Sequence, residues 1–328
     1  MPAPDFPIES LLTENERLPG IRDWLTDQVF SPERYASLPL AEYLREGEAA
    51  VCRLEEIITT GAPKVWDELV ASVQSAPSPR AWLGLDEELP SAQNRAVVVF
   101  DGLSLRELPL LLAQAHASGL RVKKCQVIAT CVPTETVAFV EQRVVGKETA
   151  PSRLPGNALL ASHNTDAFYL DQPNMRDRYP SGRSLLLWST YPDRLFKNDE
   201  ARFEDLFATF HEHHIPTLWK NTVQSLPPGL PTVITSDHGY IFFGNSLESS
   251  RASNAAALMG QSRQRRFGAE EEMPAAHPDL QLFPAKRLAL LRGRIRARAQ
   301  GAGSRRLYQH EGFSLLEVLV PWIELEPR

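Results

Sequence analysis

The spacing of apolar residues changes near residue 95 and divides the chain into two parts. Before this point, apolar residues recur three or four positions apart over 40–58 and 65–73, which predicts amphipathic helices. Prolines at 32, 39 and 63 break this pattern into short pieces, and the proline-rich stretch 75–90 is typical of a linker. We therefore expect a helical N-terminal region over residues 1–92 and a separate domain over 93–328.

From residue 96, short continuous apolar runs alternate with helical patterns. The valine-rich run 96–100 is typical of a strand that is buried on both faces of a parallel sheet. Further strands are predicted at 122–131, 185–188 and 232–235, with helices over 103–117 and 200–214. This alternation predicts an α/β fold with a doubly wound, mainly parallel sheet.

A third pattern covers residues 246–306, where we expect an insertion or lid. Residues 246–282 have no clear periodicity, whereas 286–298 could form a basic helix. Residues 251–306 hold twelve Lys or Arg and four Asp or Glu, in a chain whose formal net charge is −6. A basic segment on an acidic protein is a candidate for binding a polyanion, so Arg292 and Arg294 are candidate substrate-binding residues. The alternative is a solvated insertion without a ligand.

Composition narrows the class of protein. With 43% hydrophobic and 23% charged residues the chain is globular, and no apolar run approaches the roughly 20 residues of a membrane span. The N-terminal residues do not resemble a signal peptide. The three cysteines (Cys52, Cys125 and Cys131) lack the CxxC spacing, which is typical of reduced thiols in a cytoplasmic protein. We therefore expect a cytoplasmic protein whose metal, if any, is held by carboxylates and histidines.

Polar residues with metal-binding chemistry follow the predicted strands. Asp101 follows the first strand, Asp193 follows the strand at 185–188, and Asp237-His238 follows the strand at 232–235. Chemistry in α/β sheets collects beyond the carboxyl ends of the strands, and carboxylate plus imidazole is the ligand set of hydrolytic zinc or manganese. Each residue alone could end a strand in a polar turn, so their convergence is the evidence for a metal site.

Two more residues could complete such a site. Thr136 precedes a predicted helix over 137–144, where a threonine commonly caps the helix. The same position favours a phosphoryl group, and a metal could activate the hydroxyl as a nucleophile. His310 lies in a loop before the apolar run 315–320. The histidines at 211, 213 and 214 are expected to lie at a solvated helix end instead.

Taken together, these motifs resemble a PglZ domain, a branch of the alkaline-phosphatase superfamily known from BREX-type phage-defence systems and some bacterial signalling proteins. The resemblance covers roughly residues 95–325. It rests on Asp-Gly at 101–102, Pro-Thr-Glu-Thr at 133–136, Ser-Asp-His-Gly at 236–239 and a C-terminal motif from His310 through Glu317 to Pro321. Residues 1–92 match no family that we recognise.

The resemblance implies two neighbouring metal ions, zinc with manganese or magnesium as alternatives. One ion would be held by Asp101, Asp237, His238 and the oxygen of the nucleophile Thr136. The other would take Asp193 and His310. The chain departs from the family at Lys197, which stands where a second ligand is usual, and at Glu311, where the family usually has glycine. The second ion is therefore weak or absent, or Lys197 replaces its charge and contacts substrate.

Two functions from different classes follow. The first is a metal-dependent phosphodiesterase or phosphatase that acts on nucleotides or nucleic acid in phage defence or signalling, with protein partners in the defence system. The alternative is a catalytically weak or inactive module that docks such partners and keeps a structural metal. A sulfatase is disfavoured because neither Cys nor Ser stands at the nucleophile position.

Overall fold

The protein is built around a six-stranded sheet, described here from a computed structural model. The structure describes residues 4–11, 17–89, 91–175, 178–197, 202–243, 253–260, 262–297 and 307–327. The strand order is β2-β11-β5-β1-β4-β3. These strands are β1 (Ala96–Phe100), β2 (Val122–Ala129), β3 (Thr165–Leu170), β4 (Ser184–Ser189), β5 (Thr232–Ser236) and β11 (Leu319–Leu325). All four strands predicted from the sequence are present, and β3 and β11 are additions to them.

The sheet is mainly parallel, as the sequence predicts. β1 pairs in parallel with β4 and β5, and β3 pairs in parallel with β4. β11 is the exception, because it lies antiparallel to both β5 and β2. The α/β fold class is therefore confirmed, with one antiparallel strand inside the sheet.

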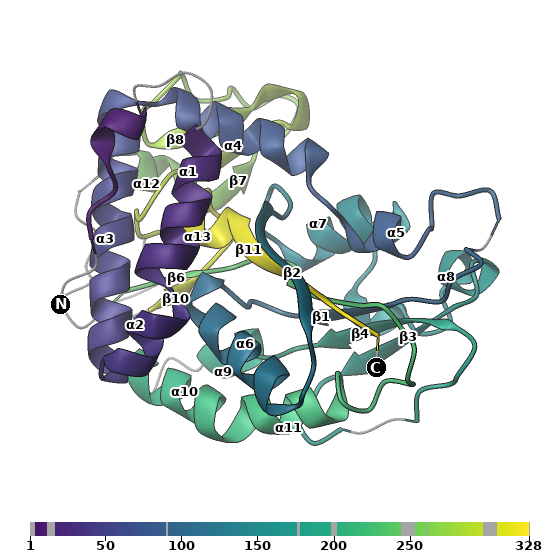
Figure 1. The fold of residues 1–328 in the computed structure, drawn as a ribbon. Coiled ribbons are helices and arrows are strands. Elements are labelled where there is room, and N and C mark those ends of the chain that lie inside the picture. The colour runs from purple at the N-terminus through teal and green to yellow at the C-terminus, as the bar shows by residue number, and fades with distance from the viewer. Residues whose placement is uncertain are drawn as a thin grey trace.

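Both faces of the sheet are covered, which explains the continuous apolar run of β1. Val98 and Phe100 pack in a large core with the N-terminal helices and with α6, α10 and α11, whereas Val97 and Val99 pack in a second core on the other face. Figure 1 shows the long helices on one side of the sheet and the short α5, α7 and α8 on the other. The helices beyond residue 92 are α6 (Leu108–Ala117), α7 (Thr136–Val140), α8 (Ala158–Ser162), α9 (Asp193–Phe196), α10 (Phe203–Thr209), α11 (Ile215–Asn221), α12 (Ala255–Met259) and α13 (Leu315–Val318).

The N-terminal region is helical, as expected. Its helices are α1 (Arg17–Trp24), α2 (Pro32–Ser37), α3 (Leu40–Gly61), α4 (Lys64–Ser75) and α5 (Pro79–Trp82), the last of which lies inside the predicted linker. This region packs directly on the rest of the chain. The ring of Trp66 lies 5.8 Å from that of Phe313, and the buried Glu48 forms ion pairs with Arg106 and Arg294. The division into two domains at residue 92 stays a prediction.

The described part of the predicted insertion forms a small antiparallel sheet. Its strands are β7 (Gln264–Arg266), β8 (Leu280–Phe283) and β9 (Leu288–Leu291), in the order β7-β9-β8. The basic helix predicted over 286–298 is wrong, because its apolar residues form the buried central strand β9; residue 298 lies outside the described residues. A two-stranded sheet pairs β6 (Ile241–Phe242) with β10 (Tyr308–Gln309). Among the described residues, no helix is both long and apolar enough to cross a membrane.

Candidate metal centre

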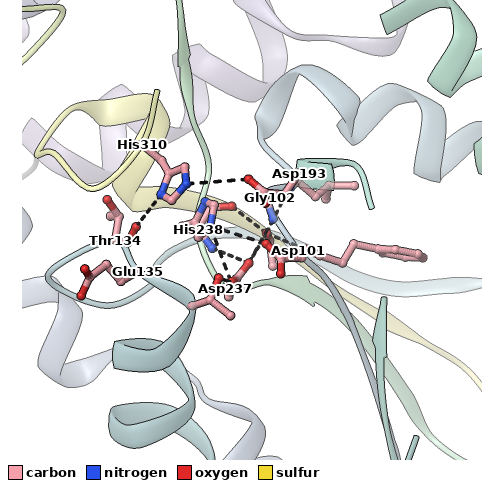
Figure 2. A network of polar contacts seen from close by, with 12 residues as sticks. Asp101, Gly102, Thr134, Glu135, Asp193, Asp237, His238 and His310 are labelled. Carbon is pink, nitrogen blue, oxygen red and sulfur yellow. Dashed lines mark hydrogen bonds and ion pairs between the residues drawn. The ribbon is translucent and has the colours of Figure 1, made fainter. Parts of the chain in front are cut away.

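Three candidate ligands meet where two neighbouring strands end. Phe100 of β1 pairs with Ser236 of β5, so Asp101 and Asp237, the next residues, lie side by side at the carboxyl edge of the sheet. Asp101, Asp237 and His238 each offer a ligand atom, and these atoms lie within 4.8 Å of one another. Figure 2 shows the three side chains converging, with Asp193 and His310 beside them.

Glycines next to these ligands allow close approach of other segments. Gly102 has a φ of +71°, and a Cβ on it would lie 2.7 Å from the hydroxyl of Tyr308 and 2.8 Å from Cβ of Asp193. A Cβ on Gly239 would lie only 2.1 Å from the carbonyl oxygen of Leu316. A side chain at either position would therefore displace part of the site.

The Asp237 carboxylate is oriented by its neighbours. Its Oδ1 accepts hydrogen bonds from the backbone N–H groups of Gly102 and His238, both at 3.0 Å. Its Oδ2 accepts a 2.8 Å hydrogen bond from the hydroxyl of Thr136 and lies 3.6 Å from Nε2 of His238. One oxygen thus fixes the carboxylate, and the other faces both the hydroxyl and the imidazole.

Two buried polar atoms in this group lack hydrogen-bond partners among the described residues. They are Oδ1 of Asp101 and Nε2 of His238, which lie 3.6 Å apart. Nδ1 of His238 lies 2.9 Å from the carbonyl oxygen of Gly239, which can only accept, so in the neutral imidazole Nδ1 carries the proton and Nε2 keeps a lone pair. Two facing lone pairs cannot satisfy each other, but a cation between them would. The residues therefore fit a divalent metal ion.

The electrostatic environment of Asp101 also favours a bound cation. Burial, together with the carboxylates of Asp237 and Asp193, raises the pKa of Asp101 well above its ordinary value. Several carboxylates in one dry site are costly unless a cation or protons offset their charge. Crowding of this kind is characteristic of functional sites.

A second group comprises Asp193, His238 and His310. The rings of His238 and His310 stack with their centroids 4.2 Å apart. Nδ1 of His310 lies 3.2 Å from the carbonyl oxygen of Thr134, so its Nε2 also keeps a lone pair, and that atom lies 3.8 Å from Oδ1 of Asp193. Burial, reinforced by His238, lowers the pKa of His310 to about 3, so its ring is neutral.

Lys197 occupies this second group. It lies one helical turn after Asp193, and its Nζ is 2.6 Å from Oδ2 of Asp193. The other oxygen of Asp193 accepts a 2.8 Å hydrogen bond from the hydroxyl of Tyr308. Partial burial would lower the pKa of Lys197, but the Asp193 carboxylate outweighs it and holds that pKa above its ordinary value. A charged ammonium therefore already balances Asp193.

The two threonines of the Pro-Thr-Glu-Thr motif have different partners. The hydroxyl of Thr134 donates a 3.1 Å hydrogen bond to the carbonyl of Gly312, in the loop that carries His310. The hydroxyl of Thr136, the first residue of α7, donates to Asp237 instead. Only Thr136 therefore directs its hydroxyl at the candidate ligands.

The C-terminal motif holds the His310 loop in place. The buried Glu317 accepts hydrogen bonds from Gly312 N–H at 2.9 Å and from the Arg263 guanidinium at 3.0 and 2.8 Å. Sequence reasoning did not identify Arg263, because it comes from the irregular insertion and no local pattern marks it. It also missed Tyr308, although its position two residues before His310 could have suggested a shared strand face.

The two candidate substrate-binding arginines have other partners. The largely buried Arg294 pairs with Glu48 of α3, and the Arg292 guanidinium donates hydrogen bonds to Oε1 of Gln281 at 3.1 and 2.8 Å. Neither has a described contact with the residues of the metal-binding groups. Similarly, His211 contacts the hydroxyl of Tyr35, and the histidines at 211, 213 and 214 form no metal-binding group among the described residues.

A cavity of about 640 Å³ opens beside Thr136 and His310. Its walls come from the start of α7, from the loop after it, from β7 and from the His310 loop. The lining residues are Glu135, Thr136, Val137, Ala138, Glu141, Glu148, Arg266, His310 and Glu311. A substrate in this cavity would reach the Thr136 hydroxyl.

No known family model matches this sequence, and no curated protein matches it. Two solved structures have a similar chain trace. Murine ectonucleotide pyrophosphatase/phosphodiesterase 5 is 13% identical, with a TM-score of 0.48 over 71% of this chain and 88% of the other. Phosphonoacetate hydrolase from Sinorhizobium meliloti 1021, in complex with phosphonoacetate, is 11% identical, with a TM-score of 0.38 over 71% of this chain and 89% of the other. At these TM-scores, any functional conclusion has to come from the residues of the site itself.

Proposed function

We propose that this protein is a metal-dependent phosphate-ester hydrolase with Thr136 as its nucleophile. The observation that carries the proposal is the pair of unpartnered buried atoms, Oδ1 of Asp101 and Nε2 of His238, beside an Asp237 carboxylate that holds the Thr136 hydroxyl. Two carboxylates and one imidazole suit zinc, and manganese or magnesium are alternatives.

The arrangement supports a two-step reaction. A divalent cation held by Asp101, Asp237 and His238 would supply positive charge that lowers the pKa of a hydroxyl and stabilises a phosphoryl group. Oγ of Thr136 forms a bond to phosphorus and passes its proton to Oδ2 of Asp237, while the bond from phosphorus to the ester oxygen breaks and the departing alkoxide takes a proton from water. Water then attacks phosphorus and releases a proton to solvent, the bond from phosphorus to Oγ breaks, and the proton on Asp237 restores the Thr136 hydroxyl.

We further propose that the centre holds one ion and that Lys197 replaces the second. The Lys197 ammonium already pairs with Asp193, where a second ion would need that carboxylate. A diester carries one negative charge on its phosphoryl group and a monoester up to two, so a centre with one ion favours a diester. Metal analysis should find one ion per chain in the wild type and a second in Lys197→Ala; two ions in the wild type would contradict the role of Lys197.

The first test of the nucleophile is the hydrolysis of bis-p-nitrophenyl phosphate at matched metal content. Thr136→Ala should lose turnover by about a thousandfold or more, since removal of a covalent nucleophile leaves only binding and electrostatic stabilisation. Thr134→Ala is the matched control, because its hydroxyl contacts Gly312 and not Asp237. Equal turnover in wild type and Thr136→Ala would exclude Thr136 from the reaction.

The resemblance to PglZ domains supports a narrower proposal, in which the substrate is a nucleotide or nucleic acid and the protein acts with partners in phage defence. Cleavage of DNA or RNA in the presence of metal tests the substrate. If the arginines of the basic segment bind phosphates, DNA binding should weaken steeply as salt rises. A flat salt response would argue against nucleic acid.

A non-catalytic docking module is the second candidate function. The Lys197–Asp193 ion pair favours it, because this pair leaves the expected two-metal centre incomplete. Purified protein without bound metal and without hydrolysis of any phosphate ester would support this function over the first.

A further inference from the structure

We propose that this site takes a phosphodiester in which one alcohol carries a protonated primary amine, and that Glu141, Glu148 and Glu311 recognise the ammonium. This inference rests on the proposed hydrolase function and assigns it a substrate class other than the nucleotide or nucleic acid of the narrower proposal. It starts from the charge of the cavity beside Thr136, which has four carboxylates and one guanidinium among its lining side chains.

The one guanidinium group that lines the cavity, that of Arg266, already has a carboxylate partner. Nη2 of Arg266 lies 3.7 Å from Oε2 of Glu135, and the side-chain amide of Gln264 donates to the other oxygen of Glu135. Arg266 therefore neutralises Glu135 and adds no net positive charge to the cavity. Within the described part of the chain, Glu141, Glu148 and Glu311 have no cationic partner at ion-pair distance.

Glu311 directly follows the candidate ligand His310. Its φ is +75°, in a region that favours glycine, so this side chain is held in an unusual backbone conformation. The hydroxyl of Ser262 donates a 2.7 Å hydrogen bond to Oε2 of Glu311, which orients the carboxylate. Its other oxygen, Oε1, has no hydrogen-bond partner among the described residues.

The cavity joins the metal-binding group, which points independently to a ligand. Thr136 and His310 line the cavity and also contact the metal-binding groups, through Asp237 and Asp193 respectively. These metal-binding groups contain the two unpartnered buried atoms, Oδ1 of Asp101 and Nε2 of His238. A diester could thus place its phosphoryl group at Thr136 and extend one alcohol into the acidic cavity.

The negative charges of the cavity favour some alcohol groups of the phosphodiester over others. A nucleic acid would bring further phosphates against three carboxylates that have no cationic partner among the described residues, and that repulsion disfavours it. An ammonium group reverses the sign of this interaction. The lining residues include no Phe, Tyr or Trp, so the cavity lacks the cage that binds quaternary ammonium groups, and a primary amine that donates N–H bonds fits it better.

The test compares p-nitrophenyl phosphodiesters that differ only in the second alcohol, using metal-loaded full-length protein. The esters carry 2-aminoethyl, the neutral isostere n-propyl, the quaternary choline group or thymidine. We expect kcat/KM for the 2-aminoethyl ester to exceed that for the n-propyl ester by roughly tenfold, which two or three partly exposed ion pairs can supply. The preference should shrink as ionic strength rises.

Replacement of the three glutamates tests whether they cause the preference for the 2-aminoethyl ester. Combined replacement Glu141→Gln, Glu148→Gln and Glu311→Gln should bring the ratio of the two kcat/KM values close to one, whereas Glu33→Gln, on the exposed side of α2, should leave the ratio unchanged. A wild-type ratio near one, a ratio that survives the triple replacement, or faster cleavage of the thymidine ester or of DNA would overturn the inference. Hydrolysis of none of these esters would instead overturn the proposed function itself.

Discussion

Two buried polar clusters in this molecule differ in how their charges are balanced. In one, the Glu48 carboxylate of α3 lies between the guanidinium groups of Arg106 and Arg294. In the other, Asp101 and His238 face each other with one unpartnered atom each. The first cluster pairs opposite charges within the chain and ties the N-terminal helices to the sheet, although Nη2 of Arg106 has no hydrogen-bond partner among the described residues. In the second cluster two acceptor atoms face each other, and only a ligand such as a cation satisfies both. Burial of charge, or a single unpartnered atom, therefore does not by itself reveal a functional site, whereas two facing acceptors do.

Disrupting the cluster around Glu48 should give the largest change in the free energy of unfolding. Glu48→Ala leaves two buried guanidinium groups without their shared carboxylate, and loss of one partner of a buried ion pair costs about 3–5 kcal/mol. Denaturant unfolding should show this loss in the free energy of unfolding, without a matching loss of metal affinity in the fraction that folds. A variant as stable as the wild type would show that the cluster does not hold the two regions together.

Replacing Asp101, in the cluster with the unpartnered atoms, should increase the stability of the metal-free protein instead of lowering it. Asp101→Asn removes a metal ligand, so zinc affinity should fall about 100-fold, equivalent to about 2.7 kcal/mol. Without metal, the same variant should melt at a higher temperature than the wild type, because it removes a buried carboxylate that lies close to Asp237 and Asp193. Calorimetry with and without zinc measures both effects. A lower melting temperature for the metal-free variant would contradict the crowding argument.

A third buried carboxylate, Glu55, should make the stability of the protein depend on pH. Burial, opposed by the Leu315 N–H and reinforced by Glu317, raises the pKa of Glu55 to about 8. The folded state then binds more protons than the unfolded state between an ordinary glutamate pKa and about 8. The Glu55 contribution to stability is therefore fully present at low pH and is lost as pH rises through this window, by up to about 1.4 kcal/mol per pH unit.

Glu55→Gln tests this linkage, because glutamine can still accept the hydrogen bond from Leu315 but does not titrate. The variant should lose less stability than the wild type between pH 5 and about 8 in urea unfolding at each pH. Parallel curves for the two proteins would show that Glu55 does not titrate in this window.

The smallest expected effect comes from Tyr308, at the edge of the second group. Tyr308→Phe removes one hydrogen bond to Asp193 but leaves the Lys197 ion pair, so the free energy of unfolding should fall by about 1 kcal/mol. Chemical denaturation measures this change. A loss several times larger would mean that Tyr308, and not Lys197, is the main support of Asp193.

Much of this architecture could be predicted from local patterns. The run 96–100 is apolar at every position because both faces of β1 are buried, and its strand bounds were predicted to the residue. The strand β9 shows where this reasoning fails. Its Leu288, Leu290 and Leu291 were assigned to a basic helix, because a short apolar run between cations has no period that separates helix from strand. The pairing with β7 and β8 decides the outcome: β8 is a close neighbour in sequence, but β7, which makes β9 the central strand, ends at Arg266, well before β9 begins at Leu288.

The sequence by itself determined four strands of the main sheet, the fold class and the residues that end these strands, including Asp101, Asp237 and His238. Strand formation and chain position depend on neighbours within a few residues, and that information is local. Only the tertiary structure decided which polar residues are balanced: it paired Arg294 with Glu48, Lys197 with Asp193 and Arg263 with Glu317, and left two site atoms unpartnered. Coulomb and hydrogen-bond energies depend on distance in space, and residues distant in the chain set those distances.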